Sequence, residues 1–116
     1  MVLNVSAAAV GTSAATENGI SAEMGAATAA ASEALVGVMP MSRVGRAKER
    51  GETQGFMKVL VDAQTERILG ASLLCIEGDE IVHSLLDVMA ANASYRVVQR
   101  AVHIHPTVSE LVPTLL

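Results

Sequence analysis

Residues 55–76 read GFMKVLVDAQTERILGASLLCI, with two runs rich in apolar and β-branched residues, Gly55–Asp62 and Ile68–Ile76, on either side of a polar stretch. This pattern predicts a β-hairpin. Side chains alternate between the two faces of a strand, so the first run has one apolar face, formed by Met57, Val59 and Val61. The second run is apolar on both faces. One of these faces can pack on helices, and the other needs a cover, for which a partner subunit is a candidate.

The residues that follow the hairpin change to helical spacing. Asp79–Asn92 (DEIVHSLLDVMAAN) predicts a helix whose core-facing stripe is formed by Ile81, Leu85, Val88, Met89 and Asn92. His83 falls on the polar face of this helix, where we expect an exposed histidine with carboxylate neighbours. Ser94 is a candidate N-cap for a second, shorter helix that we expect to end near Val102.

The residues before the hairpin predict one further strand and a connection. Leu35–Met39 is a short apolar run that ends at Pro40, which predicts a strand. A basic cluster follows and ends at Gly51; its members are Arg43, Arg46, Lys48 and Arg50. Because no aromatic residue is interleaved with the cluster for base stacking, we interpret it as a solvated loop and not as a nucleic-acid contact.

The first 34 residues differ in composition from the rest of the chain. They are rich in Ala, Ser, Thr and Gly and contain no proline. Alanine favours helix, so one interpretation is a helix over Ser21–Ala34, with a poorly specified segment before it. The alternative is a mobile tail, because such a segment buries too little apolar surface to offset its ordering entropy. We therefore divide the chain into an Ala-rich N-terminal segment, 1–34, partly helical or mobile, and a folded domain, 35–116.

Length, charge and cysteine content narrow the class of protein. A chain of 116 residues suits one small domain. The net charge of −4 argues against nucleic acid or an anionic membrane surface as the main partner. The sequence has neither an apolar run of about 18 residues nor the basic start of a signal peptide. Cys75 is the only cysteine, which excludes an intrachain disulfide and a paired redox motif; we expect it to be buried and inert, in a cytoplasmic protein.

The segment Val102–Glu110, VHIHPTVSE, holds the candidate chemical groups. His105 precedes a proline, which disfavours the α region and predicts an extended or turned backbone. Thr107 and Glu110 match the T-x-x-E capping box, which predicts a helix that opens just past His105 and is kept short or bent by Pro113. From spacing alone, these residues can equally be a helix cap beside a turn histidine. A metal site is a weaker alternative, because the two histidines of this segment are too few ligands.

Several stretches together resemble a known family. The run HPTVSE, with GETQGFMKVLVD, RILGASLL and DEIVHSLLDVMA before it, is similar to the C-terminal dimerisation domain of the pyridine nucleotide-disulfide oxidoreductases, the family of glutathione reductase, lipoamide dehydrogenase and mercuric reductase. The resemblance covers Leu35–Leu116, so 35–116 is expected to be the dimerisation domain. Before it, Val10–Gly11 is faintly similar to the family's opening strand and is a weak strand candidate, but the alanine-rich stretch after it is too long and lacks the expected prolines. It implies an α+β fold of the FAD/NAD-linked reductase dimerisation-domain type, an antiparallel β-sheet with helices packed on one face. It also implies a homodimer built through this domain.

The same resemblance implies roles for two residues. In the family, the histidine of this motif enters the active site of the partner subunit and exchanges protons with a redox-active dithiol beside the flavin. The matching residues here are His105, as the acid–base catalyst, and Glu110, as the carboxylate that orients it. The resemblance further implies a cis peptide bond before Pro106. An imidazole titrates near neutral pH, and a carboxylate on its other ring nitrogen fixes the tautomer, so these side chains suit the chemistry.

The chain departs from the family in what it lacks. It has no GxGxxG motif for a dinucleotide and no paired redox cysteines. FAD and NAD(P)H are therefore expected only in the full-length family enzyme, on flavin and nicotinamide domains that would be partners of this module. Our first hypothesis is a homodimerising module of such a reductase, inactive as an isolated chain, with no nucleic-acid or membrane partner. The alternative is a stand-alone dimeric protein that reuses the same fold to bind a small ligand.

Overall fold

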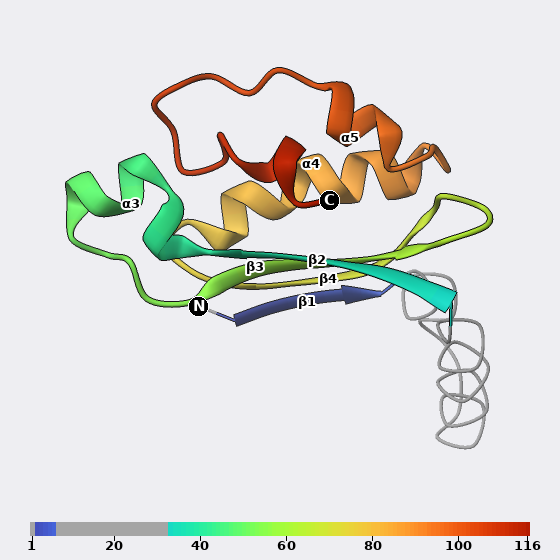
Figure 1. Ribbon diagram of the computed structural model, residues 1–116, viewed down its shortest axis with the longest axis horizontal. Helices are drawn as coiled ribbons and strands as arrows, with labels where there is room; N and C mark the ends of the chain where they lie inside the picture. The colour runs from blue at the N-terminus through green and yellow to red at the C-terminus, as the bar shows by residue number, and fades with distance from the viewer. Residues whose placement is uncertain (1, 7–32) are drawn as a thin grey trace.

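Figure 1 shows the computed structural model, which describes residues 2–6 and 33–116 and has two layers. One layer is an antiparallel sheet in the order β1-β4-β3-β2, with strands β1 Val2–Ser6, β2 Ala34–Pro40, β3 Phe56–Asp62 and β4 Ile68–Leu74. The other layer lies on one face of the sheet and holds η2 Met41–Arg43, α3 Gly45–Arg50, α4 Gly78–Ala90, α5 Arg96–Arg100 and η3 Val112–Thr114. This is the α+β arrangement that the sequence predicts.

The β3–β4 hairpin forms as predicted and supplies the centre of the core. Its buried cross-strand pairs are Met57 with Leu73 and Val59 with Ala71. The turn is closed by Asp62, whose Oδ1 accepts the backbone N–H groups of Gln64 and Thr65, each at 2.8 Å. β4 ends at Leu74, two residues earlier than the sequence predicts, because the chain turns there to enter α4.

α4 carries side chains that cover the hairpin. Its buried residues include Ile81, Val82 and Leu85, so the predicted stripe is confirmed at its first two positions. Val88 and Met89, the next two predicted positions, are partly buried and pack against the core as well. The prediction is wrong for Asn92, which is exposed and lies beyond the helix with a φ of 57°. The helix ends at Ala90, and a left-handed residue just beyond the C-cap is a position that asparagine tolerates well.

α5 is the second predicted helix, and it ends at Arg100, two residues before the predicted end. The hydroxyl of Ser94 accepts the backbone N–H of Arg96 at 3.1 Å, which is the capping role predicted for it, although Tyr95 stands between Ser94 and the helix. Ser94 also donates to Glu66 at 3.0 Å, and Arg96 contacts the same carboxylate at 3.2 Å. These bonds tie the start of α5 to the β3–β4 turn.

The basic cluster is the region where the predicted loop is wrong, because its residues form η2 and α3. Val44 and Ala47 are fully buried, which anchors this six-residue helix on the rest of the fold. Gly51 ends the helix in the left-handed conformation, with a φ of 69°. After its first glycine the helix consists of good helix formers, but six residues are too few to display a periodic apolar stripe. Arg50, at the end of the helix, pairs with Glu77 at 2.7 Å.

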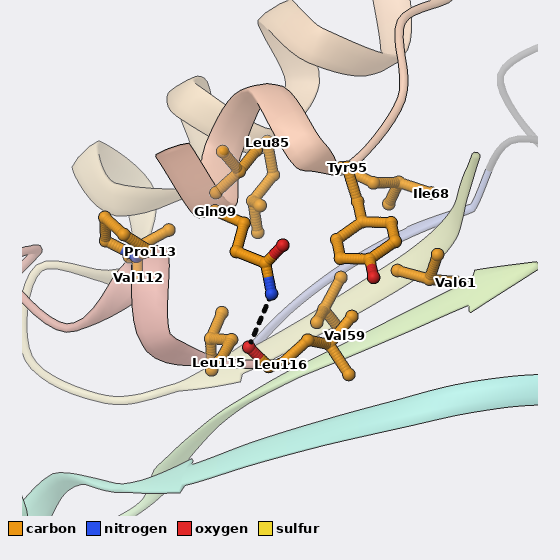
Figure 2. A pocket seen from close by; sticks show the side chains of 11 residues that line it. Val59, Val61, Ile68, Leu85, Tyr95, Gln99, Val112, Pro113, Leu115 and Leu116 are labelled. Atoms are coloured by element: carbon orange, nitrogen blue, oxygen red, sulfur yellow. Dashed lines mark hydrogen bonds between the residues drawn. The ribbon is translucent and has the colours of Figure 1, made fainter. Parts of the chain in front are cut away.

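Figure 2 shows how the C-terminal residues close the core between the sheet and α5. The side-chain amide of Gln99 donates to the carbonyl of Leu116 at 3.2 Å. The backbone of Leu115 lies so near β2 that a Cβ on Gly37 would stand 2.0 Å from its carbonyl oxygen, so only glycine fits there. The cavity drawn in Figure 2 has a volume of about 20 Å³. That is room for about one water, so it belongs to the core and is not a ligand site.

β1 extends the sheet along β4, with Val2 opposite Leu74 and Ser6 opposite Gly70. The helix predicted over Ser21–Ala34 lies outside the described residues except at its last two positions, of which Ala34 is the first residue of β2. The strand candidate at Val10–Gly11 lies outside them altogether. In the part of the chain that the structure describes, no helix is long and apolar enough to cross a membrane.

Candidate functional site

The residues between α5 and Val108, which we term the His105 segment (101–107), form an exposed loop on the helical side of the fold (Figure 1). Val102 is 92% exposed and Ile104 72% exposed. The His105 side chain is 80% exposed. The peptide bond between His105 and Pro106 is cis, as the family resemblance implies. The segment therefore presents the imidazole to its surroundings and not to the core of its own chain.

His105 and Glu110 lie in direct contact. His105 Nδ1 is 2.5 Å from Glu110 Oε2, and the carboxylate side chain is only 10% exposed. Burial by itself raises the pKa of Glu110, but the His105 hydrogen bond and charge, together with the backbone N–H groups of Thr107 and Gly45, lower that pKa below its usual value. Glu110 is therefore a carboxylate with little solvent exposure that is deprotonated at neutral pH. The sequence prediction of these two residues as one unit agrees with the geometry.

The charge state of Glu110 fixes the tautomer of His105. A deprotonated carboxylate can only accept hydrogen bonds, so Nδ1 of His105 carries the proton that lies between the two groups. The remaining ring nitrogen, Nε2, has no hydrogen-bond partner among residues 2–6 and 33–116. In the neutral ring this nitrogen holds a lone pair and accepts a proton; in the charged ring it donates one. The pair thus has the form of a base and the group that orients it.

The capping box predicted at Thr107 forms only in part. The backbone N–H of Thr107 helps to lower the pKa of Glu110, so the two residues are oriented as the motif requires. The Thr107 hydroxyl, however, donates to the carbonyl of Ile104 at 2.6 Å and does not cap a helix. The predicted α-helix is therefore wrong: residues 108–111 form turns, followed by the short 3₁₀ helix η3. Pro113 lies inside η3 and cannot donate the backbone hydrogen bond that an α-helix would need there.

His103 has a separate partner from His105. Its Nδ1 lies 2.8 Å from the carbonyl oxygen of Ser109, so this nitrogen is the donor. The bond closes the His105 segment onto the turn that carries Glu110. Nothing supports the metal alternative, since no group of three His, Cys, Asp or Glu side chains suited to a metal ion occurs within the described ranges.

Cys75 and His83 are not part of the His105–Glu110 pair. Cys75 is 6% exposed, and burial raises the pKa of its thiol. The expectation of a buried cysteine is confirmed; a buried thiol with a raised pKa is a poor nucleophile. His83 is exposed on α4, as predicted.

Two residues of α3 touch the site and were not predicted as part of it. Gly45 lies beside Glu110, and its backbone N–H helps to lower the pKa of that carboxyl. Arg46 donates from Nη2 to the carbonyl of Pro106 at 2.9 Å. Each contact joins residues about 60 positions apart in the sequence, so no local motif signals it. Because the sequence predicted a loop in place of α3, it also gave no sign that Gly45 and Arg46 lie on a helix packed against the core.

The described residues do not fit a dinucleotide cofactor. Pyrophosphate is usually bound by a Gly-rich turn at the N-terminus of a helix that follows a strand. α4 follows β4, but its first turn carries Asp79 and Glu80, whose negative charge opposes a phosphate. A flavin or nicotinamide would therefore need residues other than these.

Comparison with known proteins identifies the family. The family model of the pyridine nucleotide-disulphide oxidoreductase dimerisation domain matches residues 2–116. One curated relative is the probable pyridine nucleotide-disulfide oxidoreductase RclA of Escherichia coli, 36% identical over 72 residues, which are 62% of this chain and 16% of that protein. Another is the dihydrolipoyl dehydrogenase of Trypanosoma brucei brucei, 42% identical over 77 residues, or 66% of this chain and 16% of that protein.

The fold gives the same answer. A solved structure of the HOCl-induced flavoprotein disulfide reductase RclA from Escherichia coli matches with a TM-score of 0.76 and 28% identity, over 98% of this chain and 23% of that one. The chain thus spans about a sixth of the length of the curated relatives named above. With a family match over almost all of its length, the chain belongs to the dimerisation-domain family of the pyridine nucleotide-disulphide oxidoreductases.

Proposed function

We propose that this chain is the dimerisation module of an FAD-dependent pyridine nucleotide-disulfide oxidoreductase, and that His105 of each copy serves the active site of the other copy in a homodimer. Glu110 orients the imidazole. The isolated chain, without flavin and nicotinamide domains, is inactive as a reductase. The observation that carries the proposal is the contrast within the pair: the carboxylate is 10% exposed and the imidazole that it holds is 80% exposed.

This contrast supports a target outside the chain. An acid–base residue must come within hydrogen-bond distance of the group whose proton it moves. The thiol of this chain, Cys75, is buried at the end of β4 and has a raised pKa. An oriented imidazole that faces away from its own core is therefore suited to a thiol supplied by another domain or another copy.

The chemistry proposed for His105 is a proton transfer in each direction. Nε2 takes the proton of a thiol, which leaves a thiolate and an imidazolium ion. The nearby Glu110 carboxylate stabilises that positive charge and holds Nδ1–H in place. When a disulfide bond is broken, the imidazolium returns the proton to the thiolate that leaves, so the ring is ready for the next cycle. FAD and NAD(P)H, bound by the other domains, supply the electrons.

The experiment compares two half-reactions in the complete reductase that carries this domain. His105→Ala should lower the rate of thiol–disulfide turnover by about 100- to 10,000-fold, the usual contribution of a general acid–base group. Reduction of the flavin by the nicotinamide should stay within about twofold of the wild-type rate, because no proton transfer by His105 is needed there. Stopped-flow flavin absorbance measures one step, and steady-state disulfide reduction measures the other.

The matched control is His83→Ala, which removes an exposed histidine from α4. This variant should leave both half-reactions unchanged. Equal loss of the two half-reactions in His105→Ala, or equal effects of the two histidine substitutions on disulfide turnover, would contradict the proposed role.

A further inference from the structure

The His105 segment has few apolar contacts to hold it in place. Val102, Ile104, His105 and Pro106 are all exposed, and the first three are at least 72% exposed. Burial of apolar surface, the main force that fixes a loop on a protein, is therefore weak here. Polar contacts must determine where the imidazole points.

Most of those polar contacts are local. His103 bonds to Ser109, Thr107 to Ile104, and His105 to Glu110. Each joins residues no more than six positions apart, so together they close the segment into a small unit. Val108, which is 3% exposed, fixes one part of this unit in the core. The exposed part that carries His105 and Pro106 is left to polar contacts.

The exposed part of the unit is joined to the first turn of α3. Arg46 Nη2 donates to the carbonyl oxygen of Pro106 at 2.9 Å. Among the side-chain hydrogen bonds of residues 2–6 and 33–116, this is the one that links residues 101–107 to a distant element. Gly45, the residue before Arg46, lies beside the Glu110 carboxylate, and its backbone N–H helps to lower the pKa of that group. Two adjacent residues of one helix therefore contact the unit, at Pro106 and at Glu110.

α3 is a firm support for this purpose. Val44 and Ala47, on either side of the two residues, have no exposed surface. Arg46 also bonds from Nε to Glu49 at 2.8 Å, one turn along the same helix. The planar guanidinium thus has one edge fixed on α3 and a second donor fixed on Pro106. Gly45 leaves room for the carboxylate, since a Cβ there would lie 3.3 Å from Glu110 Oε1, tighter than ordinary contact.

We propose that Arg46 and Gly45 are positioning residues for the His105–Glu110 pair: Arg46 holds the Pro106 carbonyl, Gly45 allows the carboxylate to lie close against α3, and together they set the direction of the imidazole. Neither residue touches the reacting atoms. The consequence for catalysis rests on the proposed function of His105, whereas the geometric part concerns this chain alone and is tested separately.

The first test measures the geometry in the full chain by NMR. We expect the Nδ1–H proton of His105 to exchange roughly three- to tenfold faster with solvent in Arg46→Met than in the wild type, as follows from the loss of one hydrogen bond that is partly exposed to solvent and of ordinary strength. Arg46→Lys, which keeps one donor, should lie between the two. Arg50→Met is the matched control, because Arg50 is a cation of the same helix that pairs with Glu77 and does not contact the segment. Equal exchange rates in Arg46→Met and Arg50→Met would overturn the proposal.

The second test measures catalysis in the complete reductase. Arg46→Met should lower kcat for disulfide turnover by about 10- to 100-fold, since a misplaced catalytic group costs rate out of proportion to its displacement. The KM for the disulfide and the rate of flavin reduction should change by less than about twofold, with partial recovery of kcat in Arg46→Lys. Gly45→Ala should act in the same direction as Arg46→Met. Arg50→Met should leave kcat unchanged, and a loss equal to that of Arg46→Met would overturn the proposal.

The two proposals fail in different ways. If His105→Ala leaves disulfide turnover intact, the proposed function is wrong, while the NMR comparison still decides whether Arg46 holds the segment. If His105→Ala abolishes turnover and Arg46→Met equals Arg50→Met in both measurements, the proposed function stands and the positioning role is wrong.

Discussion

Glu110 is the residue on which the acid–base pair depends, and its pKa links the pair to the stability of the fold. The pKa is lowered from its usual 4.5 because the hydrogen bonds and charge around the carboxylate outweigh its burial. A group whose folded pKa lies below its unfolded pKa stabilises the protein above the unfolded value, and this stabilisation is lost as the pH falls through the folded value.

Glu110→Gln should therefore destabilise the chain at pH 7 and not at low pH. We expect a loss of about 1–3 kcal/mol in the free energy of unfolding at pH 7, the usual cost of removing a charged hydrogen-bonding group from a buried site. The difference between the two proteins should vanish below the folded pKa, where the wild-type carboxyl is protonated as well. Urea unfolding from pH 7 to pH 2.5 measures both curves. A constant gap across this range would show that the ionised form of Glu110 is not what stabilises the chain.

The sequence predicts the contact between His105 and Glu110 but not the contact between Arg46 and Pro106. His105 and Glu110 lie five residues apart, and the proline between them restricts the backbone, so their contact follows from local geometry and from the family motif. Arg46 and Pro106 lie 60 residues apart. Only the packing of α3 on the core brings them together, and no spacing within a single sequence encodes that packing.

At the scale of elements, α4 joins the sheet to the helical layer through its buried side. Leu85 is 1% exposed and faces the cavity of Figure 2, whereas His83 lies exposed on the same helix. Leu85→Ala should lower the free energy of unfolding by about 2–5 kcal/mol, because it removes apolar contacts and leaves a cavity. His83→Ala should change it by less than about 0.5 kcal/mol. Urea unfolding of both variants provides the measurement, and a cost for Leu85→Ala no larger than that of His83→Ala would contradict the assignment of this face to the core.

The elements that the sequence predicts correctly are those long enough to show a period. β3, β4 and α4 each extend over seven or more residues, so alternation or helical spacing is visible in them. α3 has six residues and too few apolar positions to form a stripe, although Ala47 in it is fully buried. For the C-terminal residues the error is the reverse, because the sequence predicts an α-helix that does not form. Their capping motif is present, but Thr107 bonds backward to Ile104 and the chain continues as turns.

At the scale of the whole molecule, apolar side chains of the described residues remain exposed on the sheet, among them Leu35 and Leu74, and on the helical side. On β2, Val36 and Val38 alternate with the buried Gly37 and Met39, so they lie on the face of the sheet opposite the helices. On the helical side, exposed apolar residues lie along α5 and the His105 segment; they are Val97, Val102 and Ile104. Exposed apolar groups of this kind are typical of surfaces that another protein covers. If His105 serves the active site of a partner, then the exposed residues on the helical side, Val97, Val102 and Ile104, must lie at or near the interface.

If the interface of the proposed homodimer includes the His105 segment, a charge placed beside His105 should weaken the dimer, and the same charge elsewhere on the surface should not. Light scattering over a dilution series of the full chain should show a dimer that persists to low micromolar concentration. Ile104→Glu places a carboxylate at a position that is 72% exposed in the single chain and should raise the dimer dissociation constant by at least about tenfold, because a buried unpaired charge opposes association. Ala63→Glu adds the same charge in the exposed β3–β4 turn and should leave the dissociation constant unchanged. A folded monomer at every concentration would remove the support for a cross-subunit role of His105, and equal effects of the two substitutions would place the interface away from the His105 segment.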